Sequence, residues 1–206
     1  MNKAKVAYML QKKNVVIFDF DGTLSARDSN FEFGKYCLKH SLRPWVYLPI
    51  VFIAYVGRLL NPAGVWWRKT MRMFITPKMI RKLSPQFIKE HKKLRFNWVE
   101  STVATERARG NIVVLISAGT DYLVPKLVHD INFDAVLTSR MNKQKPWCYD
   151  FLCWGSNKVI ALDNWARENK IIPNVLRSYS DSKSDLPIMN IAREQIWIDR
   201  KTGDRV

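Results

Sequence analysis

The chain has 206 residues, of which 47% are hydrophobic, 25% charged and 12% aromatic. A domain of this size buries a substantial core without disulfides, and the composition excludes disordered, collagen-like and disulfide-rich proteins. Lysine and arginine number 34 against 18 acidic residues, a net charge of +16, so the expected partners are polyanions: nucleic acid, an anionic membrane or a phosphorylated substrate.

The amino terminus lacks the features of a secretion signal, because its longest apolar run, residues 6–10, is too short and two lysines follow it. The three cysteines, Cys37, Cys148 and Cys153, are odd in number and have no metal-binding spacing. We therefore expect reduced thiols in a cytosolic protein.

The first predicted strand is the apolar run 14–18, which ends in the polar sequence Asp19-Phe20-Asp21-Gly22-Thr23. Asp28 or Ser29 is placed to cap a helix that runs to about His40. This start, a buried strand followed by carboxylates and a turn, is typical of an α/β protein with its site at a strand end.

An uncharged apolar stretch over 44–57 follows. At ~1.5 Å per residue it falls short of a ~30 Å hydrocarbon core, so an interfacial or re-entrant helix is favoured over a span. An amphipathic helix is predicted over 65–76, with Trp66 and Trp67 among basic residues.

Ser84, as cap, and Pro85, in the first turn, predict a helix that runs to about Arg109 and stops at Gly110. Beyond it, strands and helices alternate. The predicted strands are 112–116, 133–137, 175–179 and 195–198, the predicted helices are 121–130, 158–169 and 185–193, and 199–206 is a loose polar tail. We predict an α/β fold with a Rossmann-like open parallel sheet, a core of 1–24 and 109–206, and an inserted helical cap over 25–108.

Polar side chains lie where predicted strands end or a following helix begins. Each alone is most simply a turn, cap or surface residue. Together at the carboxyl edge of one sheet they form a cluster whose carboxylates repel one another unless a cation is present, and oxygen ligands suit Mg²⁺. The cluster comprises Asp19, Asp21, Ser117, Lys158, Asp181 and Asp185.

In this order these residues resemble the four motifs of the haloacid dehalogenase (HAD) superfamily. The matching segments are Asp19 to Thr23, Ser117, Gly155-Ser156-Asn157-Lys158, and Asp181-Ser182-Lys183-Ser184-Asp185. Lys143 and Lys145 are alternatives for the third motif, but the Gly-x-x-Lys context at a helix start favours Lys158. A helical cap between the first two motifs is similar to subfamily IB, which contains phosphoserine phosphatase.

The resemblance implies a Mg²⁺-dependent phosphatase that works through an aspartyl-phosphate. Asp19 would be the nucleophile, and Asp21 would protonate the leaving oxygen and later deprotonate water. Ser117, the backbone at Ala118 and Lys158 would hold the phosphoryl group. The metal would be held by Asp19, the main-chain carbonyl of Asp21 and Asp181, with Asp185 supporting the metal shell or orienting Lys158.

The cap composition bears on the substrate. Residues 57–95 carry eleven lysines and arginines and one acid, Glu90. With the apolar stretch and the two tryptophans, this pattern favours a surface that sits on anionic lipid. The alternative is an ordinary packed cap with a solvated basic face.

The aromatic-rich cap, residues 179–185 and Trp197 together resemble the phosphatidylglycerophosphatase C group. That resemblance implies conversion of phosphatidylglycerophosphate to phosphatidylglycerol at the cytoplasmic side of the inner membrane. One alternative is a soluble, cytoplasmic phosphatase of phosphoserine or another small metabolite. A distant alternative is a basic polyanion-binding protein on a HAD scaffold, which would not need every catalytic position; nucleic acid is therefore not the expected partner.

Overall fold

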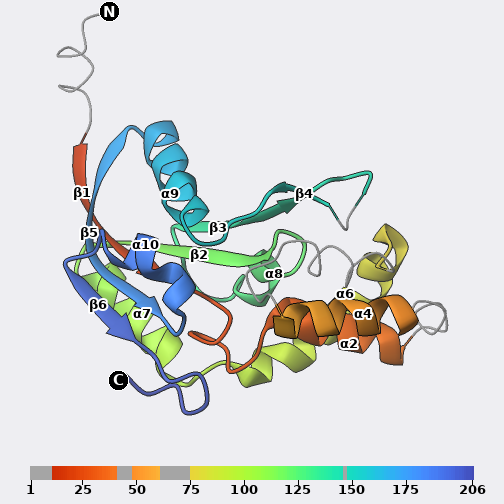
Figure 1. The fold of residues 1–206 in the computed structure, drawn as a ribbon. Coiled ribbons are helices and arrows are strands. Elements are labelled where there is room, and N and C mark those ends of the chain that lie inside the picture. Colours follow the sequence, from red (N-terminus) through yellow and green to blue (C-terminus); the bar gives the residue numbers. More distant parts are fainter. Residues whose placement is uncertain (1–10, 41–47, 61–74, 146–147) are drawn as a thin grey trace, which may run out of the picture.

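The structure, a computed structural model, describes residues 11–40, 48–60, 75–145 and 148–206. At its centre is a six-stranded sheet with the order β4-β3-β2-β1-β5-β6 (Figure 1). Neighbouring strands run parallel, except that β4 is antiparallel to β3. The strands are β1 (Gln11–Phe18), β2 (Ile112–Thr120), β3 (Ala135–Met141), β4 (Tyr149–Phe151), β5 (Ile171–Ser180) and β6 (Glu194–Trp197). The predicted open α/β fold is confirmed.

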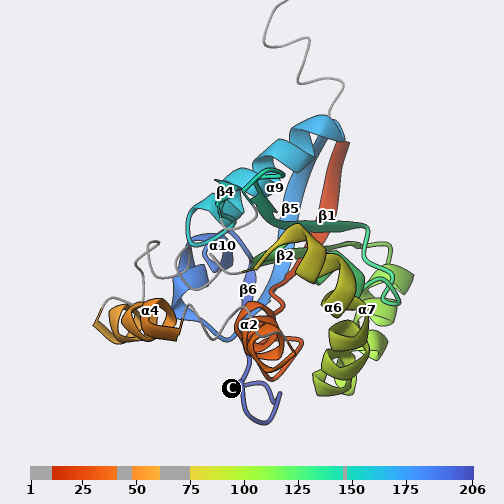
Figure 2. The same ribbon diagram turned by 90° about the vertical axis from the view of Figure 1, so that its right-hand side faces the viewer.

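Helices cover both faces of this sheet and one end of it. Figure 2 shows α7 and α9 on opposite sides of the strands, and α2 between α4 and α6 at the end that faces the viewer. The helical elements are α2 (Ser29–Lys39), α4 (Leu48–Leu60), α6 (Pro77–His91), η1 (Lys92–Leu94), α7 (Trp98–Ala108), α8 (Val124–Leu127), α9 (Asn157–Glu168), η2 (Lys183–Asp185) and α10 (Leu186–Met189).

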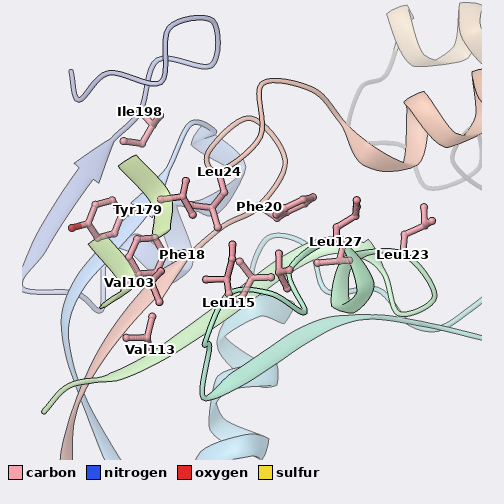
Figure 3. Packing of buried hydrophobic residues seen from close by; sticks show 14 of the residues in the cluster. Phe18, Phe20, Leu24, Val103, Val113, Leu115, Leu123, Leu127, Tyr179 and Ile198 are labelled. Carbon is pink, nitrogen blue, oxygen red and sulfur yellow. The ribbon is translucent and has the colours of Figure 1, made fainter. Parts of the chain in front are cut away.

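The central strand β1 is buried on both faces, because its side chains alternate between two hydrophobic clusters. Val16 and Phe18 belong to the cluster that includes α7 residues, whereas Val15 and Ile17 belong to the one that includes α9 and α10 residues. Phe18 stacks on Tyr179 of β5, with ring centroids 4.3 Å apart (Figure 3). This packing fixes the end of β1, where the first polar motif begins.

The prediction of one helix from Ser84 to Arg109 is wrong in two respects: the helix starts earlier, and the segment forms two separate helices. α6 begins at Pro77, capped by the Thr76 side chain, and Pro85 lies inside it. The chain leaves the helical path near Arg95 because two backbone bonds tie it to the segment after β1, from Ala26 N to Leu94 O and from Phe96 N to Leu24 O. α7 then forms separately and packs against the sheet through Val99 and Val103.

The tail predicted to be loose is instead attached to the core. The Trp98 Nε1 donates to Gly203 O at 2.7 Å, and Val206 N donates to Trp197 O. The ordered contacts follow from a turn in which the Asp199 carboxylate accepts bonds from the backbone N–H groups of Lys201 and Thr202.

Three shorter elements also differ from prediction. The helix expected over 185–193 is a 3-10 turn, η2, followed by the four residues of α10, which ends at Met189. The helix expected over 121–130 is reduced to the four residues of α8, since a turn occupies the preceding residues up to Leu123 and Pro125 stands in the first helical turn. The edge strand β4 was not predicted, because three residues give too short a pattern.

The helix expected over 65–76, with Trp66 and Trp67, lies almost wholly outside the described residues. Among the helices that the structure describes, none is long and apolar enough to cross a membrane.

Candidate active site

The first polar motif is held in place by a tight turn at the end of β1. The carbonyl of Phe20 accepts bonds from the N–H groups of Thr23, Leu24 and Ser25, while the side chains of Phe20 and Leu24 point into the core (Figure 3). Gly22 has φ of +87°, a conformation in which a side chain is strained. The turn therefore presents Asp19 and Asp21 at the carboxyl edge of the sheet.

A buried ion cluster joins three of the predicted site residues. Lys158 Nζ, at the start of α9, lies 2.7 Å from Asp19 Oδ1 and 2.7 Å from Asp185 Oδ2. Ser180 Oγ, at the end of β5, donates to the same Asp185 oxygen at 2.7 Å. The Lys158 and Asp185 side chains are each only 2% exposed, so this lysine is a fixed charge beside the Asp19 carboxylate.

The electrostatics of the cluster follow from burial and close charges. Burial would lower the pKa of Lys158, but the Asp19 and Asp185 carboxylates raise it overall, so the ammonium form persists. Burial raises the pKa of Asp19 to about 7, with further increases from Asp185 and Asp181 and an opposing effect of Lys158. An additional cation near Asp19 would favour its ionised form.

The Asp21 carboxylate is turned toward the start of α2. Its carboxylate accepts bonds from the Ser29 backbone N–H at 2.7 Å and from Ser29 Oγ at 3.2 Å. Burial, with a further contribution from the nearby Asp28 carboxylate, raises its pKa well above the usual range, although the Ser29 bonds oppose this. A carboxyl group of this kind is suited to donate a proton near neutral pH.

Ser117 and Ala118 lie at the end of β2, where the pairing with β3 is irregular between Ser117 and Thr120. Gly119 N donates to Ser117 Oγ at 2.9 Å, and the Ala118 carbonyl accepts a bond from Ser139 Oγ. A Cβ on Gly119 would lie 3.6 Å from an Asp21 carboxylate oxygen. Ser117, Gly119 and Asp21 are thus close neighbours, as expected of groups that surround one ligand.

Asp181 completes the edge beyond β5. Its Oδ1 and the Oδ2 of Asp19 lie 3.2 Å and 3.4 Å from the same hydroxyl, Thr23 Oγ1. The other Asp181 oxygen accepts a bond from Arg200 Nε at 2.8 Å. Asp19 and Asp181 are therefore side by side, and burial raises the pKa of Asp181, an effect that Arg200 and Thr23 oppose.

The donor set fits a hard divalent cation at this point. Two neighbouring carboxylates, Asp19 and Asp181, supply oxygen ligands of the kind that Mg²⁺ takes. The Asp21 carboxylate faces Ser29 and that of Asp185 faces Lys158. In the described part of the chain, no group of three or more His, Cys, Asp or Glu side chains is arranged as a metal site, so the fit rests on this pair of carboxylates.

Sequence reasoning gave no role to four residues that take part in this arrangement: Thr23, Ser180, Gly119 and Arg200. Thr23 belongs to the first motif itself, and Ser180 and Gly119 stand next to motif residues, so a search for neighbouring hydroxyls and glycines could have found all three. Arg200 lies in the segment predicted to be loose, and no sequence pattern connects it to Asp181.

Comparison with known proteins is consistent with this geometry. A family model described as haloacid dehalogenase-like hydrolase matches residues 16–190, which include all four predicted motifs. No curated protein matches the sequence.

Solved structures share the fold at low sequence identity. A protein of unknown function from Bordetella pertussis Tohama I has a TM-score of 0.79 at 13% identity, over 91% of both chains. A phospho-aspartyl intermediate analogue of phosphoserine phosphatase has a TM-score of 0.65 at 20% identity, over 91% of this chain and 87% of that one. A substrate-bound phosphoserine phosphatase complex has a TM-score of 0.59 at 17% identity, over 90% and 85%.

Proposed function

The chain belongs to the haloacid dehalogenase-like hydrolase family, and from that premise we propose that it hydrolyses phosphate monoesters through an aspartyl-phosphate on Asp19. The observation that carries the proposal is the buried cluster in which the Lys158 ammonium contacts Asp19 and Asp185 at 2.7 Å each. A phosphate ester repels an approaching carboxylate, and a fixed ammonium beside that carboxylate offsets the repulsion.

In the first step an Asp19 carboxylate oxygen attacks phosphorus, and the bond from phosphorus to the ester oxygen breaks. Asp21 donates its proton to the departing oxygen, so an alcohol leaves and Asp19 carries the phosphoryl group. In the second step Asp21 takes a proton from water, the hydroxide attacks phosphorus, and the bond to Asp19 breaks to release phosphate. The raised pKa of Asp21 supports the donor role.

The phosphoryl oxygens are held by groups from two elements. The Ser117 hydroxyl accepts a bond from Gly119 N, which leaves its own hydrogen for a phosphoryl oxygen. The backbone at Ala118 and the Lys158 ammonium supply further positive charge. Asp185 orients Lys158 rather than the metal, since its carboxylate is bonded to Lys158 and Ser180.

We assign Mg²⁺ to Asp19, Asp181 and the main-chain carbonyl of Asp21. When bound, the ion would supply charge that stabilises the phosphoryl oxygens in the transition state. The Thr23 hydroxyl lies within hydrogen-bond distance of both carboxylates and can donate to either one of them.

A small phosphorylated metabolite is the favoured substrate class, with phosphoserine the first compound to test. Two of the solved structures that share the fold over most of the chain are phosphoserine phosphatases. Phosphatidylglycerophosphate, the substrate implied by the second sequence resemblance, has no support from these comparisons.

One observation keeps a phospholipid as the second candidate substrate. The helix α4 exposes eight large apolar side chains among those that the structure describes. These are Leu48, Ile50, Phe52, Ile53, Tyr55, Val56, Leu59 and Leu60. Leu60 is 82% and Phe52 68% exposed. An apolar helix face of this kind, in a basic cap, is suited to contact an anionic lipid surface.

The proposal is tested by Mg²⁺-dependent phosphate release from soluble phosphomonoesters, including phosphoserine, and from phosphatidylglycerophosphate in mixed micelles. Asp19→Asn should lower the rate by at least ~10³-fold because the nucleophile is lost. Asp163→Asn, the same change on the exposed face of α9, should leave it unchanged.

Retained activity in Asp19→Asn would refute the mechanism. Preference for the micellar lipid, lost selectively in Phe52→Glu, would replace the small-metabolite substrate by the lipid one.

A further inference from the structure

The last eight residues bring a cation to the candidate active site. Arg200 Nε lies 2.8 Å from Asp181 Oδ2, and the Asp181 side chain is 5% exposed whereas that of Arg200 is 51% exposed. Arg200 lies beyond residues 16–190, the part of the chain that the family match covers. The contact therefore comes from a segment that the family match does not include.

Arg200 is held at this position by the turn that carries it. Asp199 N donates to Asp204 O and Gly203 N donates to Asp199 O, both at 2.8 Å, and the Gly203 carbonyl is fixed by Trp98. A Cβ on Gly203 would lie 2.5 Å from the Phe96 ring, so the turn is seated directly on the core. The guanidinium is thus presented to Asp181 by a rigid anchor rather than by a free tail.

The Asp181–Arg200 pair lies over Gly22 of the first motif. A Cβ at Gly22 would be 2.3 Å from Asp181 Oδ2 and 2.5 Å from Arg200 Nε. With Thr23 Oγ1 near the other Asp181 oxygen, both oxygens of this carboxylate have a partner from the protein itself. A metal ion that binds Asp181 must therefore share the carboxylate with Arg200.

The net charge of the site determines how strongly it attracts a cation when Arg200 also contacts Asp181. The carboxylates of Asp19, Asp181 and Asp185 meet two cationic side chains, Lys158 and Arg200. When these three carboxylates are ionised, the cluster keeps one excess negative charge. Without Arg200 the excess would be two, and the attraction for a divalent cation would increase.

We propose that Arg200 is a positioning residue that sets the affinity of the site for its divalent cation. It compensates Asp181 when the cation is absent, and it weakens cation binding because two positive charges then share one carboxylate. The inference rests on the proposed function, which assigns Mg²⁺ to this site.

The test is the binding of Mg²⁺ to the whole protein, measured by isothermal titration calorimetry and by the rise in Tm during MgCl₂ titration. Arg200→Gln should bind Mg²⁺ about three- to tenfold more tightly than wild type, as expected for a partly screened neighbouring charge. Its Tm without metal should be lower, because the Asp181 carboxylate then lacks its cation. Arg200→Lys keeps the charge and should retain a Kd close to that of wild type.

Lys201→Gln is the matched control, since it removes one positive charge from the adjacent exposed residue and should leave the Kd unchanged. An Arg200→Gln protein that binds Mg²⁺ with unchanged or weaker affinity, while wild type binds, overturns the inference and leaves the proposed function intact. A wild-type protein that does not bind Mg²⁺ overturns the metal assignment and the inference together. Far-ultraviolet circular dichroism verifies that each variant is folded before the comparison is made.

Discussion

Replacing Lys158 by methionine tests whether the buried cluster is an ion pair network. The substitution keeps the length of the side chain and removes the charge that contacts Asp19 Oδ1 and Asp185 Oδ2 at 2.7 Å each. Both carboxylates then face one another in a site where Lys158 and Asp185 are 2% exposed and Asp19 11% exposed. Removal of one partner from such a buried pair costs about 3–5 kcal/mol, and we expect this loss in the free energy of unfolding at neutral pH.

The measurement is urea denaturation of the metal-free protein, combined with a double substitution. Asp185→Asn in the Lys158→Met background removes one of the two uncompensated carboxylates, so it should recover about 1–3 kcal/mol although each single change destabilises. All three variants should be impaired in phosphate release. If Lys158→Met lowers the free energy of unfolding by less than about 1 kcal/mol, or if the double variant recovers none of it, Lys158 is not the charge that compensates the two carboxylates.

Two further substitutions test the burial of His91 at the end of α6 and the turn at Gly22 after β1. Because burial lowers the pKa of His91 from 6.5 to about 4, its neutral form contributes stability that is complete above pH 6.5 and is lost as the pH falls through 4, up to about 3 kcal/mol. Urea unfolding across this pH range should show a smaller decrease in the free energy of unfolding for His91→Gln than for wild type. The exposed His40→Gln should show the same decrease as wild type. Equal pH profiles for wild type and both variants would contradict the assignment. Gly22→Ala places a Cβ 2.3 Å from Asp181 Oδ2 at a φ of +87°, so it should lower the free energy of unfolding by at least about 1–2 kcal/mol and abolish phosphate release. Gly34→Ala, with no neighbouring atom within 4 Å of the new Cβ, should do neither, and similar behaviour of the two variants would refute the steric argument.

The sheet could be predicted because its central strands are continuous apolar runs that end in polar residues. Val15 to Phe18 is buried on both faces, and a strand of this kind has a distinctive local pattern. The convergence of Asp19 and Lys158, which are 139 residues apart, was predicted from two signals: parallel strands bring their carboxyl ends to one edge, and the Gly-x-x-Lys match at a helix start selected Lys158.

The errors in the predicted helices and tail arose where contacts between residues distant in sequence decide the structure and local sequence patterns do not. Thr76-Pro77 and Ser84-Pro85 are both good helix starts, and the earlier one is used. The break near Arg95 depends on backbone bonds to the segment after β1, and the position of the tail depends on a bond from Trp98 to Gly203, 105 residues apart. No local pattern of charge or hydropathy contains these pairings.

The two carboxylates of the first motif are supported by different parts of the molecule, although they are two residues apart. Asp19 is fixed by Lys158 at the start of α9, whereas Asp21 is bonded to Ser29, the first residue of α2. In the proposed mechanism, the position of the proton donor therefore depends on where α2 begins, and that of the nucleophile does not. A substrate contact that shifted the start of α2 would then move Asp21 and leave the charge around Asp19 unchanged.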